Sequence, residues 1–255
     1  MRTLHIIMII FTFLISGRVK AQFLDKDSSD RIIMINLGYG AYQTGGDMAN
    51  RFGFTNLAGG ELGYKFRNQL YFNAGMFFLF GSDVREPDHM RNLRYNGQTI
   101  LNINGNPAEI RTWERGYVIP IRVGRIFPRL DPFRANANSG PYLEVGMQFI
   151  QHKIRIEDIG NVVPSLAPIF RVGYDRLSNG VGVLQSIGYR YFATDKLINF
   201  FIAVDCMQHF TEERRSVQYD LPNWQVQKRT DLMFGVRAGW TVPIYRMRKG
   251  NYFIF

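Results

Sequence analysis

The sequence is poor in cysteine and in long apolar runs. Its 255 residues contain one cysteine, Cys206, which excludes a disulfide framework and a cysteine-based zinc cluster, because each needs at least two thiols. Beyond the N-terminal segment, no stretch approaches the ~18 consecutive apolar residues of a membrane-spanning helix. A helical membrane protein is therefore excluded.

Acidic residues are also scarce relative to basic ones. There are 31 Lys and Arg against 21 Asp and Glu, which gives a formal charge of +10, and such an excess raises the question of nucleic acid. The composition is otherwise 46% hydrophobic and 15% aromatic, with 25 glycines. This apolar content is too high for a disordered chain, and the length allows one or two domains.

The N-terminus has the pattern of an export signal. A short basic start is followed by a ten-residue segment that is apolar except for Thr12, Ile6 to Ile15, and by Val19-Lys20-Ala21 before Gln22. Ten residues are about half of the ~20 that a helix needs to cross a bilayer. We therefore predict a cleaved signal peptide over 1–21, with a membrane-anchoring helix as the alternative. No cysteine comes directly after the apolar run, since the only one is Cys206, so the signal is not that of a lipoprotein.

Export changes the interpretation of the charge. Removal of 1–21 deletes three bases and no acid, which leaves 28 − 21 = +7. An exported membrane protein rarely meets nucleic acid, so we predict no nucleic-acid partner. The remaining chain divides into a short segment, 22–30, and one domain, 31–255.

That domain reads as a succession of strands. Segments with period-two alternation, rich in Tyr, Phe, Ile, Val and Gly, recur between polar linkers, and their length matches the ~9–11 residues of a tilted membrane-spanning strand. We predict an all-β fold, a transmembrane antiparallel up-and-down β-barrel of eight strands. The expected strands are 31–43, 57–67, 69–80, 115–126, 140–153, 181–194, 196–210 and 230–245.

The connections support this topology because short and long ones alternate strictly. The linkers at 68, 127–139 and 195 are short or moderate, whereas 44–56, 81–114, 154–180 and 211–229 are long and polar. Outer-membrane barrels have short periplasmic turns and long extracellular loops. Two further segments, 99–103 and 169–174, lie near hairpin signals such as Asn96-Gly97 and Asn179-Gly180. Either they add two spanning strands, making ten, or they form β-ribbon that projects above the membrane. Such a projecting part either offers a strand edge to another protein or packs on itself as a loop cap.

The two faces of the strands distinguish a membrane barrel from a soluble sandwich. In 196–210 one face carries Ile198, Phe200, Ile202 and Val204, whereas Asp205 lies on the other. In strand after strand the less apolar face consists of glycine plus one or two charges. Facing lipid, each basic residue at the bilayer midplane would cost about 2–4 kcal/mol, so this face must line the lumen.

We predict that the inward charges form a network that plugs the lumen. An eight-stranded barrel is just wide enough to be filled by side chains, and opposite charges buried there must pair. The alternative is an ion or proton path through the same residues. The predicted lumen charge network is Glu61, Lys65, Arg122, Glu144, Arg190, Asp205 and Arg237.

Several phrases together give a family resemblance. The features that carry this resemblance are the signal ending at Ala21-Gln22, the strand segments Gly63-Tyr64-Lys65-Phe66 and Gly188-Tyr189-Arg190-Tyr191-Phe192, and the terminal Phe255. With these features the sequence resembles the small OmpA/OmpX-like outer-membrane β-barrel proteins, especially those of Bacteroidota. The resemblance covers about 31–255. It implies location in the cell outer membrane of a Gram-negative bacterium and no specific activity, because that fold hosts structural proteins, adhesins, enzymes and subunits of secretion machines.

Catalytic and cofactor signals are weak. His89, His152 and His209 fall in or near the long loops, with Ser82, Asp83, Asp88 and Glu212-Glu213 nearby, but no spacing resembles a triad or a metal motif. Glycine clusters lack the context of a phosphate loop. We therefore predict no catalytic, cofactor-binding or metal residues.

Basic residues suggest the partners. The arginines in the long loops are suited to bind the phosphates of lipopolysaccharide, because a guanidinium matches the geometry of a phosphate. A second basic group, on the predicted periplasmic side, either binds a protein partner or is simply solvated. The loop group is Arg85, Arg91, Arg94, Arg111, Arg214 and Arg215, and the second group is Arg125, Arg129, Arg134, Arg246, Arg248 and Lys249. The expected partners are outer-membrane lipid and lipopolysaccharide, and other outer-membrane proteins or lipoproteins.

Two functions of different classes follow. The first is a non-enzymatic barrel with a plugged lumen that acts as a structural or interaction protein, including the role of an accessory subunit of an outer-membrane secretion or protein-assembly complex. The alternative is an enzyme active at the outer rim, of the acyltransferase or protease type, or a small pore.

Overall fold

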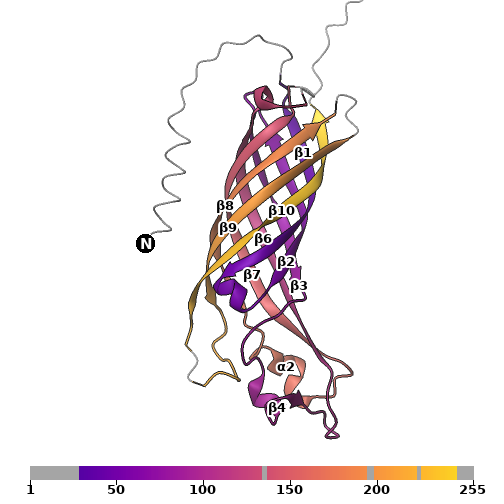
Figure 1. The fold of residues 1–255 in the computed structure, drawn as a ribbon, viewed down its shortest axis with the longest axis vertical. Helices are drawn as coiled ribbons and strands as arrows, with labels where there is room; N and C mark the ends of the chain where they lie inside the picture. Colours follow the sequence, from indigo (N-terminus) through magenta and orange to yellow (C-terminus); the bar gives the residue numbers. More distant parts are fainter. Residues whose placement is uncertain (1–28, 134–136, 194–197, 223–224, 246–255) are drawn as a thin grey trace, which may run out of the picture.

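Eight long antiparallel strands close into one barrel in a computed structural model that describes residues 29–133, 137–193, 198–222 and 225–245 (Figure 1). The ring order is β1-β10-β9-β8-β7-β6-β3-β2, so strands that follow one another along the chain are neighbours. The barrel strands are β1 (Ile32–Gly46), β2 (Phe54–Lys65), β3 (Leu70–Gly81), β6 (Ile110–Ile126), β7 (Gly140–Asp158), β8 (Ser178–Phe192), β9 (Asn199–Glu213) and β10 (Lys228–Tyr245).

The eight-stranded prediction is confirmed, and each observed strand ends within five residues of its expected bounds. The ten-stranded alternative is wrong. The segment around Thr99–Ile100 (β5) forms a small hairpin with Arg94–Tyr95 (β4) outside the barrel, where Asn96 and Gly97 take the positive φ angles of a tight turn. On its other side it contacts the chain just before β6, where the N–H of Ala108 donates to Ile100 and Leu101 bridges to Pro107.

The second extra segment is not β-structure. Pro168–Arg171 forms the short helix α2, because a proline starts it after the 3-10 turn η4 (Pro164–Leu166). The expected hairpin signal at Asn179-Gly180 lies inside strand β8 instead. The remaining 3-10 turns are η1 (Asp47–Asn50), η2 (Arg91–Leu93) and η3 (Pro128–Leu130).

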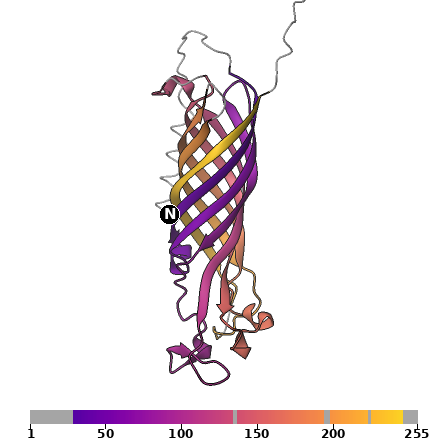
Figure 2. The same ribbon diagram turned by 90° about the vertical axis from the view of Figure 1, so that its right-hand side faces the viewer.

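The two ends of the barrel differ in the way that the linker lengths predict. The connections β2–β3, β6–β7 and β8–β9 lie at one end, the short-turn end, together with the start of β1 and the end of β10. The four long connections lie at the opposite end, the loop end, where the part containing α2 and β4 projects beyond the barrel (Figures 1 and 2).

The outer face of the barrel is apolar and the inner face is polar or small. Along β9 the burial alternates without a break, with Phe200, Ile202 and Val204 exposed and Asp205 fully buried. Such an exterior matches a lipid-facing surface. Glycines occupy the inward positions where the backbones crowd together: a Cβ on Gly75 would lie 2.1 Å from the carbonyl oxygen of Gly60 on the neighbouring strand.

Strands β6 and β7 extend past the rest of the barrel. They pair continuously from Ile110↔Asp158 to Ile126↔Tyr142, whereas β3 pairs with β6 only as far as Gly81↔Glu114. The β3–β6 ladder has one gap, next to Pro120, which has no N–H to donate. The outermost part of β6 is therefore a strand edge without a neighbouring strand on one side.

The core of the protein lies inside the barrel. Buried apolar side chains form one cluster near the short-turn end, around Tyr71, Tyr142 and Phe201, and a larger one toward the loop end. Among the described residues no helix is long and apolar enough to span a membrane. The predicted signal peptide, most of the segment 22–30, Phe255 and the basic residues Arg134, Arg246, Arg248 and Lys249 lie outside the described residues.

Candidate functional site

The middle of the lumen holds a connected set of ion pairs. The guanidinium of Arg237 lies 2.8 Å from Asp205 and 2.9 Å from Glu144, and that of Arg122 lies 3.0 Å from Glu61 and 3.3 Å from Glu144. All five side chains are at most 1% exposed. The structure thus brings together five of the seven predicted network residues, although they come from five different strands.

Two tyrosines complete this set. The hydroxyl of Tyr42 donates to Asp205 at 2.8 Å, and the hydroxyl of Tyr71 donates to Glu144 at 2.9 Å. Asp205 and Glu144 therefore each have a neutral donor besides an arginine, as burial of charge requires, whereas Glu61 is paired with Arg122 and Arg237. We call these five charged residues and two tyrosines the central network.

Arg190 and Lys65 occupy different places. Arg190 lies next to the central network, where its guanidinium is 5.1 Å from the ring centroid of Phe201 and 5.3 Å from that of Tyr71, and it donates to Asn36 at 3.0 Å. With Arg190 included, three arginines face three carboxylates, so the middle of the lumen is neutral.

Lys65 is buried at the short-turn end. Its ammonium group donates to Asn138 at 2.9 Å and to Ser29 at 2.7 Å, and none of its described contacts is to the central network. The ammonium therefore ties the turn before β7 to the segment before β1.

Buried apolar side chains lie inside the barrel together with the central network, and the ring centroid of Phe77 lies 5.6 Å from the guanidinium of Arg122. We call the five named next the apolar layer. Leu57, Phe77, Ile150, Met207 and Met233 come from five strands, and each is at most 2% exposed. These apolar side chains belong to one buried cluster inside the barrel.

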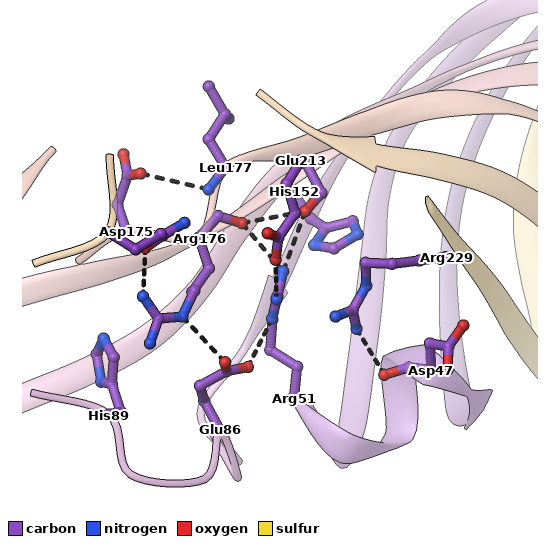
Figure 3. Close-up of polar contacts among 12 residues, drawn as sticks. Asp47, Arg51, Glu86, His89, His152, Asp175, Arg176, Leu177, Glu213 and Arg229 are labelled. Carbon is purple, nitrogen blue, oxygen red and sulfur yellow. Dashed lines mark hydrogen bonds and ion pairs between the residues drawn. The ribbon is translucent and has the colours of Figure 1, made fainter. Parts of the chain in front are cut away.

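A second set of ion pairs lies at the loop end. Arg51, in the β1–β2 loop, contacts Glu86 of the β3–β6 connection at 2.7 Å and Glu213 at the end of β9 at 2.6 Å (Figure 3). Arg176, before β8, contacts the other oxygen of Glu86 at 3.0 Å and Asp220 of the β9–β10 loop at 2.8 Å. We call these five residues the loop latch, because they join all four long connections.

The loop latch is buried despite its place among loops. Arg51 and Arg176 are 1% and 0% exposed. Burial alone would favour the neutral form of Glu86, but the charges and hydrogen bonds of Arg51 and Arg176 outweigh it and lower the pKa of this carboxyl. Asp220 also accepts the backbone N–H of Met90 at 2.7 Å. The long loops are therefore held in one arrangement.

Two of the three predicted rim histidines, His152 of β7 and His209 of β9, are fully buried on the inner face of the barrel. His152 lies 3.2 Å from Asp231, and Thr211 donates to the same carboxylate at 2.6 Å. In a catalytic triad the nucleophilic hydroxyl hydrogen-bonds to the imidazole and not to the carboxylate. Thr211, His152 and Asp231 therefore do not form a catalytic triad. His209 contacts Gln148 at 2.6 Å.

His89 has a structural environment as well. Its Nε2 lies 2.8 Å from the carbonyl oxygen of Tyr174, while the nearby Asp83 and Asp88 pair with Arg85 and Arg91. Burial and the charge of Arg176 lower the pKa of His89 against the opposing effect of this carbonyl. In the described part of the chain, no three His, Cys, Asp or Glu side chains are grouped as metal ligands.

Most of the predicted surface arginines at the loop end already have acidic partners. Five of the six lie within 4.0 Å of a carboxylate, and among the described residues Arg94 is the exception. At the short-turn end Arg129 is exposed, and Arg125 lies over the ring of Phe127 at 5.8 Å.

Comparisons with known proteins add little about function. No protein-family model matches the chain, and no curated protein does. Similar solved structures include the N-terminal β-barrel domain of Pseudomonas aeruginosa OprF (11% identity, TM-score 0.38), Ail of Yersinia pestis (13%, 0.34) and neisserial surface protein A (10%, 0.33). Each match covers 84% of this chain and 99% of the other. The eight-stranded architecture rests on the strand order of this chain itself, and an origin in Bacteroidota stays a prediction.

The loop latch leaves no pattern in the sequence. Arg51, Glu86, Arg176 and Asp220 stand in segments without periodicity, and the contacts join residues 35 to 162 positions apart. The period-two alternation that predicted the central network ends where the strands end. It therefore gives no information about residues in the loops.

Proposed function

We propose that the protein is an outer-membrane barrel with a plugged lumen that acts as a structural or interaction protein. The observation that carries this proposal is the neutral, fully buried central network together with the buried apolar layer, and we infer that they occupy the space through which solutes would pass. A barrel of eight strands has just enough room for such a filling.

The proposed location is the outer membrane, with the long loops outside the cell. The apolar outer face and the alternation of short and long connections support it. Fractionation tests the location, since the protein must sediment with outer-membrane markers. Protease added to intact cells tests the orientation, and cleavage confined to the short-turn end would contradict it.

A planar-bilayer recording tests the plug. Purified protein is reconstituted, and insertion is verified by flotation of the same vesicles. We expect no steady conductance above that of the lipid. A large, steady conductance in a preparation with verified insertion would contradict a plugged lumen and would favour the small pore.

The interaction role rests on the loop latch. Four long connections that are fixed by buried ion pairs present a preformed surface, and binding to such a surface orders little additional chain. We propose that this surface joins the barrel to other outer-membrane proteins or lipoproteins, as in a secretion or protein-assembly complex. Contacts of the exposed basic residues with lipopolysaccharide remain part of this proposal.

Cross-linking in intact cells tests the interaction role. Wild-type protein should retain a partner at constant stoichiometry after affinity purification. Arg176→Met, which breaks the loop latch, should lose it, whereas the control Arg214→Met, at an exposed ion pair of the same loop region, should keep it. Wild-type protein that purifies alone under native expression would contradict the role.

A further inference from the structure

We propose that the open edge of β6 at Ile110–Trp113, with the pocket beside it, is an acceptor site for an extended acidic segment of a partner protein. This inference rests on the proposed interaction role and names the site and the kind of partner. It follows from three features of the loop end: an unpaired strand edge, a pocket along that edge, and an arginine without an acidic neighbour.

The first feature is the direction of the main-chain groups of β6. In an antiparallel sheet, alternate residues direct their N–H and C=O groups to opposite sides. The N–H of Ile126 donates to Gln69, and that of Ala108 donates to Ile100, both on the side away from β7. The pairing of β6 with β7 is uninterrupted, so Ile110 and Thr112 direct their groups to the same side as Ile126 and Ala108.

On that side the edge has no partner. The β3 ladder stops at Gly81↔Glu114, and within the described chain no hydrogen bond is made by the N–H or C=O groups of Ile110 and Thr112 on this side. Both residues are half-buried. Unpaired strand edges of this kind are templates for the addition of another strand.

The second feature is a cavity of about 420 Å³ that runs along this edge. Its volume lies within the range of ligand pockets. The lining is mostly polar and joins β6 to the hairpin β4–β5 and to the loop latch through Glu86. The residues that argue for a ligand are Ile110, Thr112, His89, Arg94, Gln98 and Thr99.

The third feature is the charge of this pocket. The carboxylate of Glu86 is bound on both oxygens by Arg51 and Arg176, so its charge is already compensated. Arg94 is exposed, donates one hydrogen bond to the carbonyl of His89, and has no carboxylate within 4.0 Å among the described residues. The remaining charge in the pocket is therefore positive, which favours an acidic side chain.

Strand addition combines these features. The main chain of the added segment bonds to Ile110 and Thr112, and alternate side chains enter the pocket, where Arg94 selects an acid. Backbone bonding supplies affinity without sequence preference, and the pocket supplies the preference. A fully extended segment of about five residues spans ~17 Å and covers the open edge.

A labelled peptide tests the proposal on the whole protein in lipid nanodiscs. The probe is acetylated, amidated Thr-Glu-Thr-Glu-Thr-Glu-Thr, and binding is followed by fluorescence anisotropy. We expect saturable binding that is at least tenfold weaker when every Glu is replaced by Lys. Of the two peptides N-methylated at alternate residues, one should lose binding and the other should keep it, because only one set of N–H groups faces β6.

Variants of the protein make the same distinction. Thr112→Pro removes the N–H on the open side, leaves the β6–β7 ladder intact and should weaken binding at least tenfold. Thr112→Val keeps that N–H and should bind within threefold of wild type. Arg94→Gln should abolish the preference for Glu over Lys while it retains the effect of N-methylation.

Several results would overturn the site. The first two are the absence of binding by wild type at millimolar peptide and equal effects of the two N-methylated peptides. The other two are competition by free glutamate that is as strong as competition by the peptide, and binding by Thr112→Pro that is unchanged from wild type. The proposed interaction role fails separately. If cross-linked partners persist in Thr112→Pro, the role stands and the site is elsewhere; if wild type binds the peptide but has no partner in cells, the role fails.

Discussion

Replacement of Arg237 by methionine is expected to destabilise the barrel strongly. The guanidinium is 1% exposed and pairs with Asp205 at 2.8 Å and Glu144 at 2.9 Å, with Glu61 at 3.9 Å. Methionine preserves much of the packing and removes the charge. The neutral middle of the lumen then carries one uncompensated negative charge.

The magnitude follows from these contacts. One pair of unit charges ~4 Å apart contributes about 4 kcal/mol at an effective dielectric constant of ~20, and removing one partner of a buried pair typically costs ~3–5 kcal/mol. We expect Arg237→Met to lower the free energy of unfolding by ~3–5 kcal/mol. The double variant Arg237→Met with Asp205→Asn restores neutrality and keeps an acceptor for Tyr42, so it should recover at least ~1 kcal/mol of this loss.

The assay is reversible urea unfolding in lipid vesicles, followed by tryptophan fluorescence. Val236→Met is the matched control, since it creates the same residue at the adjacent, outward position of β10 and should change stability by less than ~0.5 kcal/mol. If Arg237→Met unfolds within ~1 kcal/mol of wild type, or if the double variant is less stable than the single one, the charge-balance reasoning is refuted.

Three further predictions concern pH, crowding and lipid exposure. The pKa values of His89 and Glu86 are lower in the folded protein than in the unfolded chain. The stability that these groups give to the folded loops is therefore fully present above the unfolded pKa values of ~6.5 and ~4.3, and it is lost as pH falls through the lower folded values. Protease cleavage of the long loops should accordingly increase on acidification. Gly75→Ala, whose Cβ would meet a neighbouring backbone, should destabilise by ~1–3 kcal/mol, whereas Met76→Ala on the lipid face should cost less. Cys206, which is exposed on the outer face, should react in vesicles with an apolar maleimide and not with a charged one.

Each of these has a contrary outcome. Cleavage of the loops that is independent of pH between 7 and 4 would exclude both groups as its cause, and a pH dependence that stays unchanged in His89→Gln would exclude His89. Refolding of Gly75→Ala with wild-type stability would mean that the strands move apart at low cost. Rapid labelling of Cys206 by the charged reagent would place this part of β9 in water.

Sequence patterns predict the barrel well because its rules are local. Period-two alternation placed Asp205 and Arg237 on the inner face, and the hydrogen-bond ladder of a closed sheet leaves no other face for buried charge. Lys65 also lies on the inner face, as the alternation predicts. It lies nearer the short-turn end than the central network, however, and so contacts Asn138 and Ser29. Alternation fixes the face of a side chain and says nothing of the neighbours that it meets across the lumen.

The loops show the opposite situation. Polar segments without periodicity gave no indication that Arg51 and Arg176 would be buried and share Glu86, and the hairpin signals near 169–174 predicted strand where α2 forms. The sequence by itself determined the positions of the eight spanning strands, the inward face of each and the alternation of short and long connections, because these depend on neighbouring residues; that 99–103 and 169–174 add no further strands was decided by the tertiary structure. Only the tertiary structure decided which charges pair, how the loops lock together and where an edge of β6 stays open, since those depend on residues that closure of the barrel brings together from distant parts of the chain.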